Sequence, residues 1–390
     1  MLRNRRIKGC HKVIKAVKRF VEIRANEIRK VRCFLDDKFS RLWQRFAICA
    51  LKPDAAEPLV VFLVPFTDRV SGGLMSITAM AMVTRRLLPR ATVVLSTLPG
   101  TQTKRRISLF PNEERIFVFS LLCRRMRPGR MVLHIPEMML AKFCAELPSG
   151  FREWLRAIPD LQVNILNQNI LMMPEPKLWK GLFDLTSNVT QTTAHRSYST
   201  QEVCDRFGVP LHHLSVYLDT NHWPCTPFDK KEKLIVFSPD GNSHSGEIKE
   251  VIRRELPEYR IAVVRNLKFM DYLRLVSRAM CTITFGEGFD AYFCQPVEVG
   301  SLGFAVYNEE FFPGREWLSL PNVYASWEEM AQRLPGDIRR LERNSAEYYA
   351  IQRRQGGMIA AIYGYDKFED NLRRFYGGQY DYHPKRPVSI

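Results

Sequence analysis

The sequence predicts an α/β protein of two similar domains, each a parallel sheet with helices, behind a basic helical leader. Three observations predict this. Short, fully apolar segments such as Leu59–Pro65 alternate with longer amphipathic ones, a pattern typical of buried parallel strands separated by helices. The alternation occurs twice, on either side of a poorly periodic, proline-containing segment over residues 222–233. The chain has 390 residues, and a single hydrophobic core stops growing near about 250–300 residues.

Residues 1–53 form the predicted leader. Apolar residues recur there at steps of three and four, for example at Cys10, Ile14, Val17 and Val21, which predicts an amphipathic helix. The segment holds 16 Lys and Arg against 4 Asp and Glu, so it carries +12 of the net charge of +17. Three interpretations remain open: a helix on an anionic membrane surface, a coiled coil that joins copies of the chain, and a solvated helix packed on the body.

Residues 54–221 form the first predicted domain, a Rossmann-like fold. Its expected strands are Leu59–Pro65, Thr92–Ser96, Arg115–Ser120, Met131–His134, Leu161–Leu166 and Asn188–His195, and its expected helices are Leu74–Leu88, Met138–Leu147, Phe151–Ile158 and Ser199–Phe207. Gly72 and Gly73 stand between the first strand and its helix. Glycine there lets the backbone approach a phosphate at the helix N-terminus, although such a pair is as typical of a plain turn.

Residues 222–233 are the predicted linker, and residues 234–376 form the second, also Rossmann-like, domain. Its expected strands are Leu234–Phe237, Arg260–Val264, Cys281–Phe285 and Gly303–Tyr307, and its expected helices are Glu247–Leu256, Phe269–Ala279, Pro296–Val299, Trp327–Leu334 and Ser345–Phe375. Residues 377–390 are expected to be a loose tail. Two such domains facing each other across a linker predict a cleft, the usual place for a ligand.

Charge and cysteine usage exclude several classes of protein. Outside the leader, 42 basic residues face 37 acidic ones, a net charge of only +5, which disfavours nucleic-acid binding by the body. The nine cysteines form neither a C-x-x-C pair nor a zinc pattern, and scattered thiols favour a reducing compartment. The longest clean apolar run, Leu59–Phe66, is far shorter than the about 20 residues that span a membrane. A cytoplasmic location is therefore predicted.

The strongest candidate site is the turn Phe285–Asp290, which follows a predicted strand of the second domain. Glu287 lies on this turn, and Glu298 follows eleven residues later in a segment expected to begin a helix. Ligands of such sheets bind outside the carboxyl ends of the strands. An acidic residue at a helix start can accept hydrogen bonds from ribose hydroxyls, and Glu287 can contact a sugar. A capping residue and a solvated helix residue are the plainer interpretations of these two glutamates.

These residues resemble a known signature. Glu287-Gly288-Phe289 and Pro296-Val297-Glu298 resemble the E-G-F-G…P-x-E signature of retaining GT-B glycosyltransferases, of the type that includes many bacterial polysaccharide enzymes. Gly303–Val306 resembles the strand that follows the signature. The fourth signature residue is Asp290 instead of glycine, and the two glutamates lie three residues further apart than in the family. Ser238–Asn242 stands where the family has a Gly-Arg and a Lys that grip a diphosphate.

The resemblance implies the GT-B fold and a nucleotide-sugar donor held mainly by the second domain, with the acceptor on the first. It implies that Glu298 holds the ribose and Glu287 acts at the donor sugar. The implied donor site is completed by these residues: Gly72, Gly73, Gly288 and Phe289, with Arg265 or Lys268 supplying positive charge. His195 would contact the donor from the first domain, or else is a satisfied histidine at a strand end. No cofactor is expected, and no Asp-x-Asp motif calls for a metal.

Two functions remain open on this basis. The first is a glycosyltransferase that moves a sugar to a glycan or a lipid-linked acceptor of a surface polysaccharide, held by its leader on the inner face of the cell membrane. The second is a non-catalytic GT-B-like interaction protein, with the leader as its assembly helix. Homo-oligomers are compatible with either function. Fold alone does not separate them.

Overall fold

The computed structural model describes residues 57–65, 71–98, 114–217, 220 and 223–386, together with residues 48, 51, 110 and 112. Almost all of the predicted leader lies outside these ranges. The described end of the leader contacts the body, because Ile48 is buried in the core of the first domain and Leu51 packs against it.

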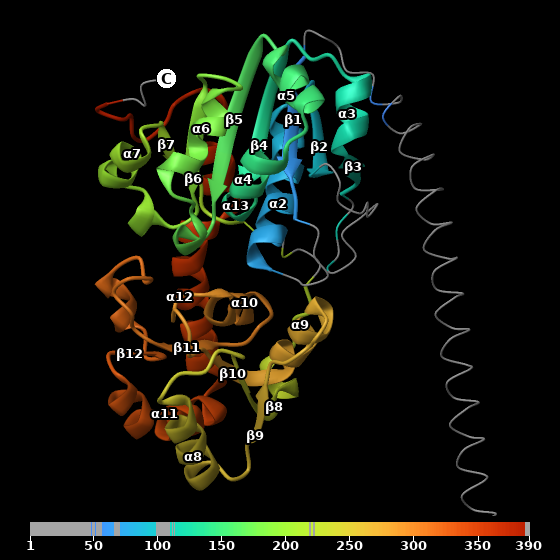
Figure 1. Ribbon diagram of the computed structural model, residues 1–390. Coiled ribbons are helices and arrows are strands. Elements are labelled where there is room, and N and C mark those ends of the chain that lie inside the picture. The colour runs from blue at the N-terminus through green and yellow to red at the C-terminus, as the bar shows by residue number, and fades with distance from the viewer. Residues whose placement is uncertain are drawn as a thin grey trace, which may run out of the picture.

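The first domain is a seven-stranded parallel sheet with helices on both faces (Figure 1). Its strand order is β3-β2-β1-β4-β5-β6-β7. The strands are β1 (Leu59–Leu63), β2 (Thr92–Thr97), β3 (Ile116–Val118), β4 (Arg130–Pro136), β5 (Asp160–Asn167), β6 (Val189–Thr193) and β7 (Leu211–His213). The helices are α2 (Gly72–Leu87), α3 (Phe119–Arg125), α4 (Glu137–Glu146), α5 (Ser149–Arg156), α6 (Lys180–Phe183) and α7 (Gln201–Phe207), with 3₁₀ turns η1 (Ile170–Met172), η2 (Pro176–Trp179) and η3 (Arg196–Tyr198). All five residues of β1 are buried, as its unbroken apolar run predicts.

The second domain is a smaller parallel sheet with the order β12-β11-β10-β8-β9. Its strands are β8 (Glu232–Phe237), β9 (Arg260–Val263), β10 (Ala279–Ile283), β11 (Gly303–Val306) and β12 (Val323–Tyr324). Its helices are α8 (Ser245–Glu255), α9 (Phe269–Arg278), α10 (Ala291–Glu298), α11 (Trp327–Arg343) and α12 (Ser345–Tyr363), with η4 (Phe228–Lys230) and η5 (Arg315–Ser319). The predicted linker is therefore partly structured, because η4 lies within it and β8 begins at its last residues. Two Rossmann-like domains are confirmed.

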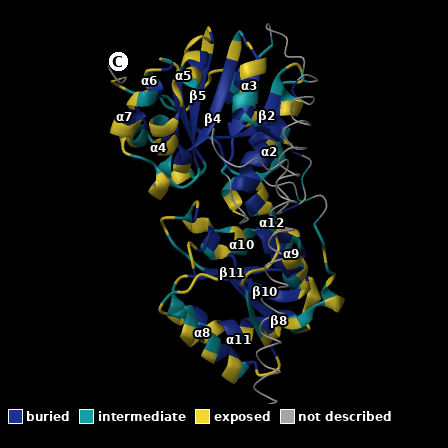
Figure 2. Ribbon diagram, turned by 45° about the vertical axis from the view of Figure 1, so that its right-hand side comes forward, coloured by how far each residue is buried: buried dark blue, intermediate teal, exposed yellow. Residues whose placement is uncertain are grey.

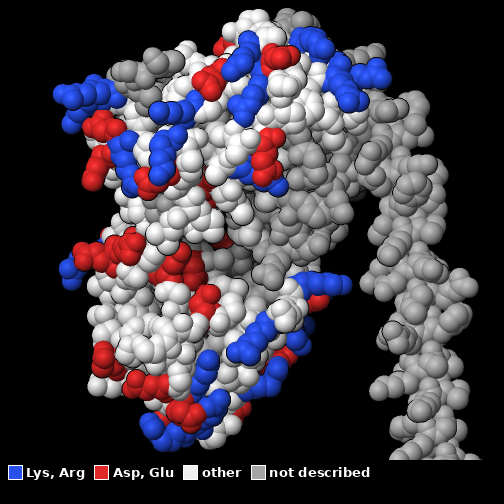
Figure 3. Space-filling view, viewed as in Figure 1, with Lys and Arg blue, Asp and Glu red and all other residues white. Residues whose placement is uncertain are grey.

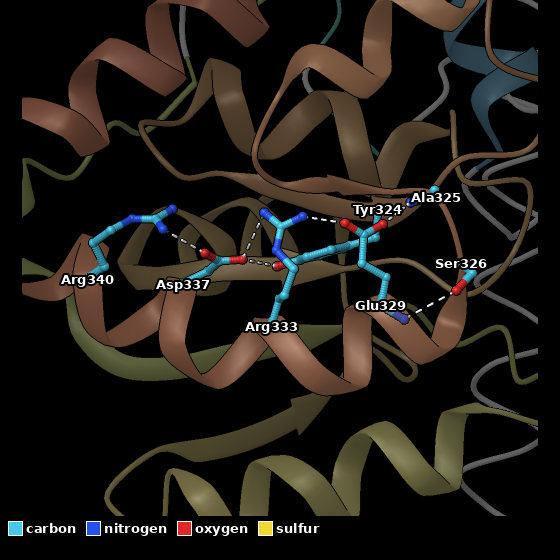
Figure 4. Close-up of polar contacts among 7 residues, drawn as sticks. All are labelled: Tyr324, Ala325, Ser326, Glu329, Arg333, Asp337 and Arg340. Atoms are coloured by element: carbon cyan, nitrogen blue, oxygen red, sulfur yellow. Dashed lines mark hydrogen bonds and ion pairs between the residues drawn. The ribbon is translucent and has the colours of Figure 1, made fainter.

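A buried ionic network attaches α11 to β12 (Figure 4). The Tyr324 hydroxyl donates to Asp337 at 3.0 Å, and Arg340 pairs with the other oxygen of Asp337 at 2.9 Å. Arg333 pairs with Glu329 and lies 3.7 Å from Asp337. Because the charged and hydroxyl groups satisfy one another, Asp337 is tolerated at only 5% exposure. The network is structural and contacts no residue of the candidate site.

The order of the strands reverses once in each sheet, and these reversals fix where loops converge. In the first sheet β1 lies between β2 and β4, and in the second β8 lies between β9 and β10. The loops that follow β8 and β10 are Ser238–Asn242 and Phe285–Asp290, so the predicted turn lies at the reversal of the second sheet. Figure 2 shows the buried sheets as the centres of two separate bodies, one above the other.

The chain ends on the first domain, not on the second. Helix α13 (Tyr365–Tyr376) packs Phe368, Leu372 and Phe375 into the core around β1. The tail that follows is also attached, because Tyr382 pairs with Leu211 of β7 as an isolated antiparallel bridge. The expectation of a single helix over 345–375 is wrong, since the helix breaks at Gly364. The expectation of a loose tail is wrong for residues 377–386, the part of the tail that the structure describes.

Candidate functional site

The turn after β10 is held in shape by glycine. Gly288 has a φ of +81°, and a Cβ there would lie 2.8 Å from the Val306 carbonyl oxygen. Both features require glycine. The next residue, Phe289, is buried among aromatic rings, with its ring centroid 4.8 Å from that of Trp317. These two residues therefore shape the turn that presents Glu287, and their predicted contact with a donor stays a prediction.

Asp290 explains why the fourth signature residue is not glycine. Its Oδ1 accepts the Tyr292 amide at 2.7 Å and the Phe293 amide at 3.1 Å, which caps helix α10. Its Oδ2 accepts the Thr284 hydroxyl at 2.6 Å. The first amides of α10 are thereby satisfied within the protein. A diphosphate consequently has no free helix N-terminus at this turn.

Glu287 lies in an acidic environment. The residue is exposed toward the cleft, yet the protein on its other side desolvates the carboxyl and raises its pKa. Neighbouring carboxylates raise the pKa further, those of Asp290, Asp240 and Glu310. Among the residues that the structure describes, no Lys or Arg forms an ion pair with Glu287, Asp240 or Glu310. Figure 3 shows acidic side chains gathered on the second domain along the hollow between the domains.

A cavity of about 790 Å³ opens between the two domains beside this turn. The first domain lines it with residues that follow β6, among them His195, Arg196 and Ser199, and the second with residues that follow β10 and β11, among them Phe289 and Glu310. Residues of α12, α13 and the tail, such as Lys367, complete the lining. The carboxyl ends of both sheets thus face one space, as the sequence predicts. The Tyr198 hydroxyl donates to Glu310 at 3.0 Å and so joins the two domains across it.

His195 lies on the first domain's side of this cavity. It follows β6, and its ring makes an edge contact with Tyr198 at a centroid distance of 6.1 Å. Burial lowers the pKa of His195, so the imidazole is neutral at pH 7. A neutral imidazole can donate one hydrogen bond and accept another. The structure therefore brings His195 and Phe289, which lies two residues after Glu287, to the same cavity.

The position of Glu298 differs from the expectation. Helix α10 begins after Asp290, so Glu298 is its last residue and not the start of a helix. Seven residues of helix separate Glu298 from Ala291, about 10 Å along the axis. Burial raises the pKa of Glu298, opposed by a hydrogen bond from the Thr220 hydroxyl in the segment between the domains. Glu298 thus lies beside the segment that connects the two domains. The family's usual spacing from Glu287 would instead reach Gln295, which is buried on the same helix.

The two predicted cations lie at the edge of the second sheet. Arg265 and Lys268 follow β9 and are exposed, and Lys268 immediately precedes α9. Strand β8 separates β9 from β10, so the two strand ends are about 10 Å apart. No ion pair involving Arg265 or Lys268 occurs within the described part of the chain. Both cations are available to an anion at the open side of the turn.

The glycine pair begins α2 at the matching edge of the first sheet. Ser71 caps the helix by accepting the Leu74 amide at 3.2 Å, and Gly72 and Gly73 are its first two residues. A Cβ on Gly73 would lie 2.3 Å from the Gln168 Oε1 atom, whereas Gly72 faces open space. The lack of a side chain at Gly73 therefore leaves room for the Gln168 side chain, which belongs to the loop after β5. The helix end carries no acidic residue in its first turn, which keeps it attractive to anions.

Sequence reasoning missed a set of buried polar groups at the same edge. Asn167 is 3% exposed and neither of its side-chain polar atoms has a partner, and one carboxylate oxygen of Glu137 is also unpartnered. Burial raises the pKa of Glu137. Both residues stand at the carboxyl ends of β5 and β4, next to the reversal of the first sheet. The sequence signal that could have identified these two residues is their position just after predicted strands.

The described residues hold neither a cluster of metal-ligating side chains nor a helix that could span a membrane. Within the described ranges no group of three or more His, Cys, Asp or Glu side chains is placed to hold a metal ion. Among the helices of those ranges, none combines the length and apolar character needed to cross a membrane. Independence from metal stays a prediction.

Comparisons with known proteins support the fold. No family model matches the chain, and no curated protein matches it. Among solved structures, it is similar to sucrose-phosphate synthase from Thermosynechococcus elongatus, with a TM-score of 0.52 and 10% identity over 83% of this chain and 98% of that one. It is also similar to the catalytic domain of starch synthase IV from Arabidopsis thaliana bound to ADP and acarbose, with a TM-score of 0.53 and 8% identity over 81% and 99% of the two chains. The chain therefore has the GT-B arrangement of two Rossmann-like domains.

Proposed function

We propose that this protein is a glycosyltransferase that moves a sugar from a nucleotide-sugar donor to an acceptor. One observation carries the proposal: Glu287, with its raised pKa, stands on the turn at the reversal of the second sheet, and Phe289 of the same turn lines a cavity between the two domains. Ligands of such sheets bind at this point. The GT-B fold of the chain and the signature around Glu287 support the same reaction class.

The proposed donor site divides between the domains. Glu298 holds the ribose beside the segment that connects the domains, while Glu287 of the second domain and His195 of the first contact the donor sugar. Asp290 already occupies the amides of α10. The diphosphate is therefore assigned to the N-terminus of α2 at Gly72 and Gly73, opposite Arg265 and Lys268. Positioning and stabilisation of the leaving diphosphate supply catalysis.

The finer proposals follow from the signature and the leader. The reaction is retaining and needs no metal or cofactor. The acceptor is a glycan or a lipid-linked sugar of a surface polysaccharide, bound by the first domain. The basic residues 1–53 hold the enzyme on the inner, cytoplasmic face of the cell membrane, and copies of the chain can associate through the same segment. Activity that disappears with EDTA and returns with manganese would contradict metal independence.

The decisive experiment is calorimetric titration of nucleoside diphosphates and their sugars. Wild-type protein should bind at least one nucleotide, and Glu298→Ala should weaken that binding by on the order of 1.5–3 kcal/mol, the range for a charge-assisted hydrogen bond. Glu287→Ala should abolish transfer and leave nucleotide affinity largely intact. Glu347→Ala, on the distant helix α12, is the matched control. Unchanged affinity in Glu298→Ala would remove its ribose assignment.

A second function is favoured by one specific observation. The carboxylates around Glu287, without a described ion-pair partner, repel a diphosphate, and Ser238–Asn242 lacks the family's cations. A GT-B-like protein that acts by binding another protein in a polysaccharide assembly complex would tolerate such a cleft. Absence of thermal stabilisation by every nucleotide at millimolar concentration would favour this function, because a bound ligand stabilises the folded state by mass action.

A further inference from the structure

Large apolar side chains are exposed in one region of the first domain. The described residues include five large exposed hydrophobic residues, of which Leu267 lies alone in the second domain. The other four are Met138, Leu171, Met172 and Leu178. We refer to these four residues as the apolar rim. Leu171 is 88% exposed and Met138 is 57% exposed, so these side chains extend into solvent. Exposed apolar groups gathered in this way mark an interaction surface.

The apolar rim is formed by adjacent loops. Met138 follows β4 at the start of α4, and Leu171 and Met172 follow β5 in η1. Strands β4 and β5 are paired in parallel, so their carboxyl ends meet. The Asn169 amide donates to Glu137 at 3.1 Å and ties the two loops together.

The fourth residue of the rim is held beside them by packing. Leu178 lies in η2, whose next residue, Trp179, is buried and stacks on Phe207 at a centroid distance of 4.7 Å. Helix α4 contacts η2 directly. The rim is therefore a fixed feature of the fold, although its side chains are free.

Charge around the apolar rim favours an anionic partner. Lys177 and Lys180 flank Leu178 and form no ion pair with any residue that the structure describes, whereas Glu175 is paired with Arg206 at 3.8 Å. Long lysine stems can lie along an apolar surface while their ammonium groups reach phosphates. An apolar rim that carries two lysines without described ion-pair partners at Leu178 fits the boundary between acyl chains and anionic headgroups.

The apolar rim also borders the proposed acceptor side of the cleft. Glu137 and Asn167, which carry buried polar atoms without partners, immediately precede its two loops along the chain. A molecule with a sugar head and an apolar chain has both kinds of surface. We propose that the apolar rim docks on an anionic lipid surface and so presents the cleft to a lipid-linked acceptor. Only the lipid-linked acceptor in this proposal rests on the proposed transferase function, whereas the docking on lipid does not.

Hydrogen exchange of the full chain with vesicles tests the docking. The probe is vesicles of phosphatidylcholine and phosphatidylglycerol in a 3:1 ratio, about the anionic content at which basic segments bind, with pure phosphatidylcholine for comparison. Amides of residues 168–180 should become protected with the anionic vesicles, and those around Leu267 should not. Because protection is measured segment by segment, the experiment distinguishes binding by the apolar rim from binding by the leader. If the chain co-sediments while residues 168–180 stay unprotected, the leader alone binds and the proposal is overturned.

Substitution supplies the second measurement. Leu171→Ser combined with Met172→Ser should weaken vesicle binding about ten-fold or more, given the apolar area that no longer leaves water. Leu267→Ser is the matched control and should bind as wild type. Equal binding by the double variant would overturn the proposal. Neither experiment contains nucleotide, so their results do not depend on whether the proposed transferase function is correct. Conversely, nucleotide binding without rim protection would refute only the lipid docking.

Discussion

At the scale of single residues, two glycines of the candidate site differ in how strictly they exclude a side chain. At Gly288 the backbone is left-handed and a Cβ would meet a carbonyl oxygen of β11. At Gly73 the backbone is helical and a Cβ would meet only the end of the flexible Gln168 side chain. A backbone atom cannot move aside as a side chain can. The two positions therefore predict opposite responses to the same substitution.

Gly288→Ala should destabilise the protein by about 1–3 kcal/mol, the cost of a strained conformation, with the clash in addition. Gly73→Ala should leave stability nearly unchanged, because alanine favours a helix by about 0.5–1 kcal/mol and offsets the displacement of Gln168. Denaturant unfolding of both variants measures the difference. Equal losses at the two sites would show that the turn after β10 is not constrained as described.

The carboxyl of Glu287 predicts a dependence of stability on pH. Its pKa is raised in the folded state, so the protonated form is favoured on folding. This contribution is complete below the unfolded pKa of about 4.3 and is lost as the pH rises through the raised folded value. Glu287→Gln should therefore raise Tm by a few degrees at pH 7 and have little effect near pH 4. A thermal melt that gave the larger gain at pH 4 would contradict the acidic environment.

At the scale of elements, helix α10 determines the geometry of the candidate site. Its N-terminus is set by Asp290, and its length carries Glu298 away from the turn to the segment between the domains that contains Thr220. Pro296 was expected near the start of a helix, yet it lies inside the last turn of α10. Proline is compatible with this position only because the helix begins earlier and ends soon after. One cap thus decides the separation of the two predicted functional glutamates.

Asp290→Ala should cost about 0.5–2 kcal/mol through the lost cap, and it leaves the Thr284 hydroxyl without its acceptor. Asp290→Asn keeps an oxygen that can accept the Tyr292 amide, so it should retain most of the stability. The comparison uses chemical denaturation together with the affinity of the nucleotide found by titration. Two variants of equal stability would remove the capping role of Asp290.

At the scale of the whole molecule, α13 and the tail connect the second domain back to the first. Asp381 accepts the His213 amide at 2.7 Å and Arg374 at 2.9 Å, and it lies 3.0 Å from His212. Burial opposes ionisation, but these partners outweigh it and hold the pKa of Asp381 below its usual range. Tyr376 reaches His134 in the middle of the first sheet at 3.1 Å. The two domains are therefore joined by a second connection besides the linker.

Asp381→Ala should release the tail and destabilise the first domain by about 1–3 kcal/mol, as expected when a charged partner of hydrogen bonds is removed. Because the folded pKa of Asp381 is lowered, its contribution is present above about pH 3.9 and is lost as the pH falls through the folded value. Hydrogen exchange in β7 measures the release at pH 7. Asp366→Ala, at an exposed position of α13, is the control. Unchanged exchange in β7 would refute the second connection.

The leader adds a prediction for the intact chain. A chain that starts at Ala55 should keep the two-domain fold at lower stability, because Ile48 is removed from the core of the first domain. It should lose the salt-sensitive part of its binding to anionic vesicles, since each basic residue near such a surface contributes about 1 kcal/mol. Co-sedimentation at low and high salt measures this part. Full-length protein that ignores the vesicles, and becomes monomeric only on truncation, would identify the leader as an oligomerisation helix.

The amino-acid sequence by itself determined the repeated α/β architecture, because fully apolar strands and amphipathic helices have periods that can be counted along the chain. The turn at Glu287 was visible for the same local reason, since Gly288 and its neighbours form a short contiguous motif. Tertiary structure alone decided what depends on distant partners. It placed Glu298 beside Thr220, joined His195 and Phe289 to one cavity, gathered Asp240 and Glu310 around Glu287, and returned the tail to β7. Contacts between residues far apart in the chain leave no periodic trace in it, so such placements follow only from packing.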